Sequence, residues 1–412
     1  MKKSLLAVAA MGAFASAAQA QSSVTVYGIL DVGFQGVTTR GAASSSTSTA
    51  VQNPVAYGKA NQTRFSGEGA QSTSRLGFRG NEDLGGGTAA FFTVEFGLNP
   101  TDATLSGSFG NGLFNRQSFV GLSQKGIGRA AIGTQNTPVH MAVVRTDPGQ
   151  VNNMLGNVIY ATNASQGNGQ TATSYTVRYN NALTLTSERM AGFQVNAIYN
   201  NNNTDVNQTA LAGGSTNNNA YGAGINFVHK KLNVDVAIQG SQSTNWSAQQ
   251  NAGPAGAPAQ SSLVANLPAN VLGSALIMNQ MYGGAVYDFG ILKAYAQYIS
   301  AKYSNQANSG QYLERTAQQI GVRGNWTPKI ESWASAGTGR FTGQNLGQSA
   351  AAYTDNSASV TQNFTGYQLG TNYIMSKRTN LYAIYGSTQV SSSSVAVSEG
   401  GSSYGVGIRH TF

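Results

Sequence analysis

Arginine residues alternate with apolar residues over one short stretch of this chain. Arg75 and Arg79 flank Leu76 and Phe78. Because successive side chains of a β-strand face opposite sides, this spacing places the two arginines on one face and the two apolar side chains on the other. Guanidinium groups that line a water-filled space attract anions. The chemistry predicted here is therefore ion binding or selection.

The same alternation assigns further charged side chains to a polar strand face. Glu95 lies between Val94 and Phe96, and Arg178 lies between Val177 and Tyr179, which we place on the apolar face together with Tyr175. The remaining charged residues predicted to face inward in this way are Asp31, Arg323, Arg340 and Arg409.

Catalytic patterns are missing from the sequence. The chain has no cysteine and three histidines, His140, His229 and His410, without metal-ligand spacing and without a Gly-x-Ser-x-Gly nucleophile motif. No run of five basic residues suggests nucleic-acid binding. We predict no enzyme activity, no cofactor, no metal site and no nucleic-acid partner.

The N-terminal residues resemble an export signal. Lys2 and Lys3 precede a short apolar run that ends at Ala18-Gln19-Ala20, a small-x-small cleavage pattern. That run is shorter than the roughly 20 residues of a transmembrane helix. We predict a cleaved signal peptide over residues 1–20 and one domain over residues 21–412.

Composition narrows the fold class. Charged residues make up 9% of the chain, well below the ~25% of ordinary soluble proteins. No later stretch of about 18 apolar residues indicates a membrane helix. The 19 Tyr and 16 Phe residues argue against disorder. Scattered apolar residues in a polar chain favour a closed β-barrel with lipid outside and water inside.

Turns between the alternating segments predict the number of strands. Residues 24–34 and 404–412 alternate clearly, and seven tight turns separate further segments, at 81–87, 124–128, 187–190, 229–231, 288–290, 327–329 and 376–379. Long polar stretches occupy residues 40–70, 200–219, 241–275 and 341–362. Seven turns join fourteen strands, and the first and last strands bring the total to sixteen. The prediction is an all-β, 16-stranded antiparallel transmembrane barrel.

Aromatic residues near the predicted strand ends fit interfacial girdles. They are Tyr282, Tyr287, Tyr295, Trp326 and Trp333.

Three segments resemble the general porins of Gram-negative bacteria, in the branch typical of beta-proteobacteria. They are Ser74-Arg75-Leu76-Gly77-Phe78-Arg79-Gly80, Arg116-Gln117-Ser118-Phe119-Val120-Gly121-Leu122 and Gly407-Ile408-Arg409-His410-Thr411-Phe412. The resemblance implies a homotrimer in the outer membrane, in contact with lipid and lipopolysaccharide. It also implies passive diffusion of ions and small hydrophilic solutes, and a C-terminal Phe412 that the barrel-assembly machinery reads.

A third loop folded into the lumen as a constriction is also implied, here from about Thr137 to Gln170. In the family, basic residues at the positions of Arg75 and Arg79 face this loop across the pore. Family members often carry several acids in the loop, whereas this chain has only Asp147, with Arg145 nearby. The chain also has Gly133-Thr134 where the family usually has Gly-Arg. We therefore expect a mild anion preference.

Other functions remain open at this stage. A substrate-specific porin differs from a general one in loops whose fold the sequence does not reveal. An outer-membrane hydrolase would need the catalytic groups that are missing above. An adhesin or autotransporter would carry a large passenger domain ahead of its barrel, and here the alternating strands begin directly after the signal.

Overall fold

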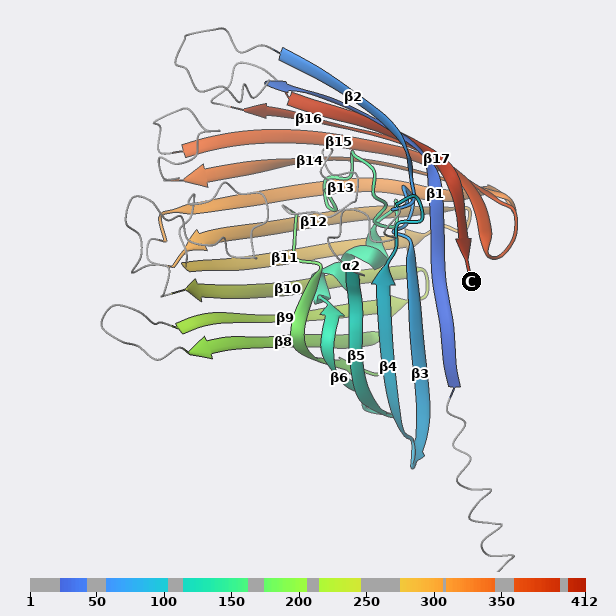
Figure 1. The fold of residues 1–412 in the computed structure, drawn as a ribbon, viewed down its shortest axis with the longest axis vertical. Coiled ribbons are helices and arrows are strands. Elements are labelled where there is room, and N and C mark those ends of the chain that lie inside the picture. The colour runs from blue at the N-terminus through green and yellow to red at the C-terminus, as the bar shows by residue number, and fades with distance from the viewer. Residues whose placement is uncertain are drawn as a thin grey trace, which may run out of the picture.

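A computed structural model of the chain shows one large antiparallel sheet that closes on itself (Figure 1). The structure describes residues 23–42, 57–102, 114–161, 174–205, 215–245, 275–306, 309–344, 359–392 and 399–412. The predicted signal peptide lies outside these residues and stays a prediction.

Within the described residues, seventeen strands and one α-helix are present. The strands of the first half are β1 (Ser23–Ala42), β2 (Tyr57–Ser66), β3 (Arg75–Gly85), β4 (Thr88–Gly97), β5 (Phe114–Gln124), β6 (Gly128–Asn136), β7 (Arg178–Ser187), β8 (Phe193–Asp205) and β9 (Ser215–His229). Those of the second half are β10 (Leu232–Asn245), β11 (Ala275–Asp288), β12 (Leu292–Asn305), β13 (Tyr312–Thr327), β14 (Ile330–Gln344), β15 (Ser359–Ile374), β16 (Thr379–Ser392) and β17 (Glu399–Thr411). The helix is α2 (Pro138–Thr146).

The seventeen strands form a sixteen-stranded barrel because β2 and β3 share one position. Both pair with the same edge of β1, β2 with its C-terminal half and β3 with its N-terminal half. The opposite edge of β1 pairs with β17 from Ile29 to Arg40 and closes the barrel. Closure leaves no unpaired sheet edge in the lipid. The predicted fold class is confirmed.

All seven predicted tight turns separate consecutive strands in the structure. The prediction of a long loop over residues 40–70 is wrong, because this range contains β2, which pairs with β1 along Gly33–Ala42. The sequence of β2, Tyr57–Ser66, is polar and lacks clean alternation, so it gave no strand signal.

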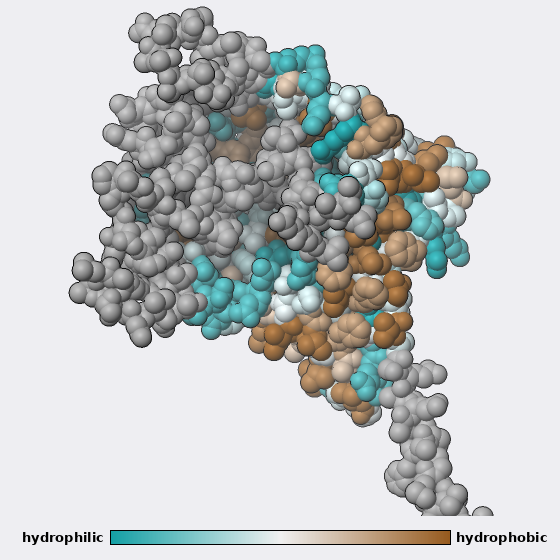
Figure 2. Space-filling view, in the orientation of Figure 1, coloured by the Kyte–Doolittle hydropathy of each residue, from teal (hydrophilic) through white to brown (hydrophobic). Residues whose placement is uncertain are grey.

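The barrel wall separates an apolar outer face from a polar inner one. In the last strand Tyr404, Val406 and Ile408 are exposed on the outside, while Ser403 and Gly405 are buried. Brown hydrophobic residues gather over the outer face of β3 to β6 in Figure 2. None of the helices among the described residues is long and apolar enough to cross a membrane.

Two of the predicted girdle residues lie in the interior. Tyr282 is fully buried and its hydroxyl meets that of Thr146 in α2, and Trp333 is buried beneath the guanidinium of Arg323. Trp326 and Tyr287 are exposed as expected. Strand parity, which we did not apply to these aromatics, separates the two groups.

Candidate functional site: the constriction of the pore

After β6 the chain folds into the barrel and forms α2 (Figure 1). Thr137 caps the helix, since its hydroxyl accepts a hydrogen bond from the backbone N–H of His140, and Pro138 occupies the first helical turn. The backbone N–H of Val139 donates to the Gln239 side chain of β10 at 3.2 Å. The predicted constriction loop is therefore present, and we use this name for its described residues, 137–161 and 174–177.

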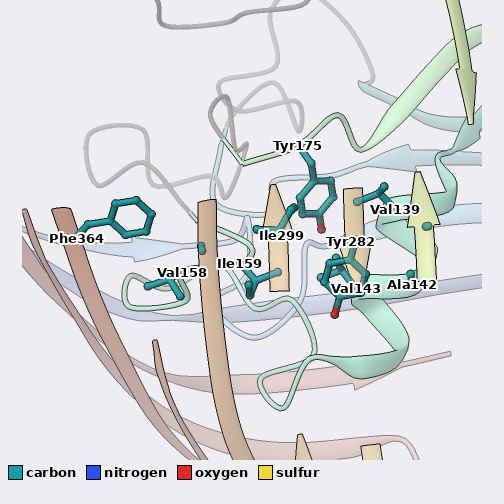
Figure 3. Close-up of a cluster of buried hydrophobic side chains, with 11 residues drawn as sticks. Val139, Ala142, Val143, Val158, Ile159, Tyr175, Tyr282, Ile299 and Phe364 are labelled. Atoms are coloured by element: carbon teal, nitrogen blue, oxygen red, sulfur yellow. The ribbon is translucent and has the colours of Figure 1, made fainter. Parts of the chain in front are cut away.

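Apolar side chains fix the constriction loop against one side of the lumen (Figure 3). The buried cluster joins Val139, Val143, Val158 and Ile159 of the loop to wall residues such as Ile299. Burying an aliphatic side chain stabilises a fold by about 1.5–3 kcal/mol. This cluster therefore holds the loop inside the barrel instead of leaving it extended in water.

Three guanidinium groups gather on the opposite wall. We call Arg75 of β3, Arg116 of β5 and Arg178 of β7 the arginine cluster. The carboxylate of Glu95 lies 2.7 Å from Nε of Arg116 and 3.8 Å from Nη1 of Arg75. The guanidinium of Arg178 lies 5.8 Å from the centre of the Phe114 ring.

The charge of this cluster acts on the constriction loop. Burial, together with the positive charges of Arg178, Arg116 and Arg75, holds the pKa of His140 well below its usual range. His140 is therefore neutral at physiological pH. Its Nδ1 lies 3.1 Å from the hydroxyl of Tyr175.

Arg116 was not among the predicted site residues. Glu95 pairs with Gln117 and Phe96 with Asn115, so Arg116 is the extra residue of a β-bulge. A bulge re-aims a side chain and interrupts the alternation on which the prediction rested. The available signal was its place in the Arg116-to-Leu122 motif, from which we carried over no role.

Arg178 was predicted to face inward because its neighbours Tyr175, Val177 and Tyr179 were assigned to the lipid face, and that assignment is wrong. Tyr175 and Tyr179, which we assigned to the lipid face, are buried inside the barrel. Opposite Thr134, β7 has an extra residue, and Asn181 there has a φ of 51°. This irregularity reverses the strand parity.

Arg79 and Arg409 contact side chains of the inner face of the wall. The guanidinium of Arg79 lies 5.4 Å from the ring centre of Tyr27, whose hydroxyl donates to Glu95. Nε of Arg409 donates to the Ser72 hydroxyl at 3.1 Å.

Arg340 was assigned to the wrong face. It is exposed on the outside and its Nε donates to Asn363, whereas its neighbour Phe341 faces inward, beside the guanidinium of Arg315. An aromatic side chain against a buried guanidinium thus occupies the inner position that we expected for Arg340. Arg315 is itself a buried lumenal arginine that the sequence reading missed.

The charged residues of the constriction loop are engaged in hydrogen bonds. Nε of Arg145 donates to Asp235 of β10 at 2.8 Å. Asp147 is buried and accepts hydrogen bonds from the Val151 N–H at 2.7 Å, from Asn157 at 2.8 Å and from Gln319 at 3.1 Å. Burial raises the pKa of the Asp147 carboxyl, against the opposing effect of these donors.

Arg323, the second inward arginine of β13, forms an ion pair with Glu331. Both ends of the Glu331 carboxylate accept from Arg323, at 2.8 and 2.7 Å, and Nη1 of Arg323 donates to the Pro148 carbonyl of the constriction loop at 2.6 Å. Bidentate pairs of this kind are strong and geometrically specific. This pair therefore holds the loop in place and contributes little net charge.

The predicted acid Asp31 is fully buried in the wall. Its carboxylate accepts from the hydroxyl of Tyr382 and from two backbone N–H groups, those of Gln71 and Ser72. The terminal Phe412 pairs through its backbone with Gly28, and its ring covers that glycine. Its reading by the assembly machinery stays a prediction. No group of three His, Cys, Asp or Glu residues able to hold a metal ion occurs among the residues that the structure describes.

A closed sixteen-stranded barrel with a loop folded into its lumen defines a membrane channel. The family profile of the Gram-negative porins matches residues 7–393, and the chain belongs to this family. It is an outer-membrane porin, which confirms the predicted function and location.

Individual relatives agree. The chain is 30% identical to an outer membrane porin protein of Bordetella pertussis over 428 residues, covering all of both chains. It is 34% identical to outer membrane porin protein 32 of Delftia acidovorans over 200 residues, 48% of this chain and 49% of that one. Among solved structures, an anion-selective porin from Comamonas acidovorans matches with a TM-score of 0.64 and 20% identity, over 95% of this chain and all of that one.

Proposed function

We propose that this porin is a passive diffusion channel with a mild preference for anions, and that the arginine cluster produces this preference. The carrying observation is the local imbalance of charge: Arg75, Arg116 and Arg178 stand together with one carboxylate, Glu95. Along the constriction loop Arg145 pairs with Asp235 and Arg323 pairs with Glu331, while the buried Arg315 donates to the Val158 carbonyl and lies over two phenylalanine rings. The largest local excess of positive charge therefore lies in the arginine cluster.

An uncompensated cluster of this kind favours anions for an electrostatic reason. In a narrow aqueous passage with walls of low dielectric constant, charge of one sign raises the local concentration of counter-ions. Arginine side chains are a common means of attracting anions in pores. The fold similarity to a porin described as anion-selective supports the proposal.

The test is the zero-current potential of the purified protein in a planar bilayer under a KCl gradient. We expect an anion-selective potential that falls toward zero in an Arg75→Ala, Arg178→Ala double variant. Arg340→Ala is the control, because it removes one positive charge from the outer face. A potential that is unchanged in the double variant, or that falls equally in the control, would overturn the assignment.

We propose in addition that the protein is a homotrimer without enzymatic activity. A related barrel of Vibrio cholerae is described in a trimer form. Mass photometry of detergent-solubilised protein tests the oligomer, with a monomer as the contrary result. His140 is buried, His229 ends β9, and His410 lies in the last strand. Measurable lipase or protease activity of the folded barrel would contradict the proposal that the protein has no enzymatic activity.

A further inference from the structure

One position of the barrel wall is interrupted. Ile29 of β1 pairs with Arg75 at the start of β3, and Gly33 of β1 pairs with Ser66 at the end of β2. Between Ser66 and Arg75 the chain leaves the wall for eight residues, Gly67–Ser74, which we call the inward segment. Most of this segment is buried.

Asp31 lies in the middle of the gap that the inward segment leaves in the wall. Its Oδ2 accepts hydrogen bonds from the backbone N–H groups of Gln71, at 3.1 Å, and Ser72, at 2.6 Å. Its Oδ1 accepts from the hydroxyl of Tyr382 on β16 at 2.6 Å. Its own backbone N–H donates to the Ser74 hydroxyl at 2.9 Å. One carboxylate thus satisfies backbone groups that the missing strand pairing would leave without partners.

Further contacts fix the inward segment across the lumen. The side chain of Gln71 donates to Asn372 of β15 and accepts from Asn380 of β16, each at 2.9 Å. The turn also requires a glycine, because Gly69 has a φ of 82° and a Cβ there would lie 1.9 Å from the Ser72 carbonyl oxygen. The segment is therefore a defined structure and has little freedom to adopt another.

The inward segment contacts both sides of the constriction. Toward the arginine cluster, the carbonyl of Thr73 accepts a hydrogen bond from Nε of Arg75 at 3.0 Å. Toward the constriction loop, Gly69 and Ala70 offer their carbonyls to Asn153, to its side chain at 2.8 Å and to its backbone N–H at 2.9 Å. The Asn153 side chain also reaches the Thr73 hydroxyl at 3.2 Å.

We propose that Asp31 is a positioning residue for the constriction, and that the inward segment it anchors clamps the Arg75 guanidinium and the constriction loop at a fixed separation. This role rests on the proposed anion preference, because it concerns the geometry of the same arginine cluster. Asp31 does not act on ions in transit: its carboxylate is buried and occupied by three donors. Its effect passes through the backbone of residues 71–73.

The direction in which Asp31→Asn changes the selectivity shows whether Asp31 acts by positioning Arg75 or only by its negative charge. Asp31→Asn removes one negative charge, which by itself makes the lumen more positive and raises the anion preference. The amide keeps only one acceptor oxygen, so it cannot accept both from the Tyr382 hydroxyl and from the backbone N–H groups of Gln71 and Ser72, and the anchor of the inward segment is weakened. If the segment positions Arg75, the anion preference falls instead, and current noise rises as the loop loosens.

The experiment records single-channel currents and zero-current potentials for Asp31→Asn, Tyr382→Phe and Asn153→Ala, with Asp83→Asn in the exposed end of β3 as the charge-matched control. We expect Asp31→Asn to lower the chloride-over-potassium permeability ratio by roughly twofold, the opposite of the electrostatic effect, and to increase open-channel noise. Tyr382→Phe and Asn153→Ala leave the charge unchanged and should raise the noise in the same way.

Each result decides the proposal. A higher anion preference with quiet currents in Asp31→Asn would overturn it, as would quiet currents in both neutral variants. If Asp31→Asn fails to fold, the two neutral variants carry the test. Increased noise with an anion preference that does not depend on Arg75 and Arg178 would support the clamp and refute only the proposed filter.

Discussion

The charged side chains on the two sides of the constriction differ in how fully they are paired. On the wall, Arg75, Arg116 and Arg178 share Glu95, so guanidinium groups outnumber carboxylates. On the loop, Asp147 receives three donors and lies near the positive charge of Arg323. The wall therefore carries an excess of charge, whereas the loop uses its acid to hold its own backbone.

This contrast explains how a loop that is nearly free of acids can still form a working constriction. Asp147 connects the turn after α2 to Asn157 within the loop and to Gln319 on β13. A fully satisfied buried polar network rigidifies a structure. We infer that the loop supplies the shape of the pore and the wall supplies its electrostatic preference.

The largest effect is expected for Glu95→Gln, which removes the carboxylate of the arginine cluster. The buried guanidinium of Arg116 and the partly exposed guanidinium of Arg75 lose their ionic partner, so the free energy of unfolding should fall by about 3 kcal/mol. The anion preference should rise, because the excess positive charge increases. Urea unfolding and zero-current potentials measure the two effects. Glu82→Gln in the exposed end of β3 is the control. An unchanged zero-current potential in Glu95→Gln would contradict the inference that the wall produces the anion preference.

Asp147→Asn makes the same change of charge on the other side. The amide loses acceptor capacity toward Val151, Asn157 and Gln319, so we expect the free energy of unfolding to fall by about 1–3 kcal/mol. The anion preference should change less than in Glu95→Gln, because the hydrogen bonds and Arg323 already offset this carboxylate. Equal shifts of the potential in the two variants would show that the sides do not differ.

Much of the fold could be predicted from the sequence because strand parity and turn chemistry are local. Alternation in residues 404–412 and the seven turns were enough to count the strands. The inward segment could not be predicted, because its backbone groups are satisfied by Asp31, which is distant in sequence. The polar strand β2 was missed for a related reason: its pairing with β1 defines it, and its own residues do not alternate clearly.

The site was predictable only where the strands are regular. Arg75, Arg79 and Arg409 followed parity correctly. Arg116 lies in a bulge and Arg178 next to a second irregularity, and each interruption shifts which side chain faces inward. Arg340 was misplaced because we took the aromatic Phe341 as the lipid-facing residue, whereas it packs inside against Arg315.

The effect of ionic strength on the unmodified protein should show whether the anion preference arises from the wall or from the loop. The screening length falls from about 30 Å at 0.01 M salt to about 3 Å at 1 M. An anion preference that arises from the water-facing arginine cluster should therefore weaken as the mean KCl concentration rises at a constant gradient ratio. The zero-current potential measures this directly. A preference that stays constant over this range would point to steric selection by the loop.

The smallest effect concerns His140, which links the two sides. In the folded protein its pKa lies well below the usual 6.5, because the side chain is buried and faces the charges of Arg178, Arg116 and Arg75. Below pH 6.5 the unfolded chain binds a proton that the folded chain does not, so the free energy of unfolding falls as the pH decreases through this window. Asp147 has the opposite effect on the free energy of unfolding at pH values above 3.8, because its pKa is raised and its folded form then binds the extra proton.

We expect His140→Gln to lose less thermal stability than the unmodified protein between about pH 7 and about pH 5.5, measured as the shift in Tm. His229→Gln, at the exposed end of β9, is the matched control, because it removes a histidine and leaves His140 in place. An equal loss in His140→Gln would mean that the arginine cluster does not act on the loop through this histidine.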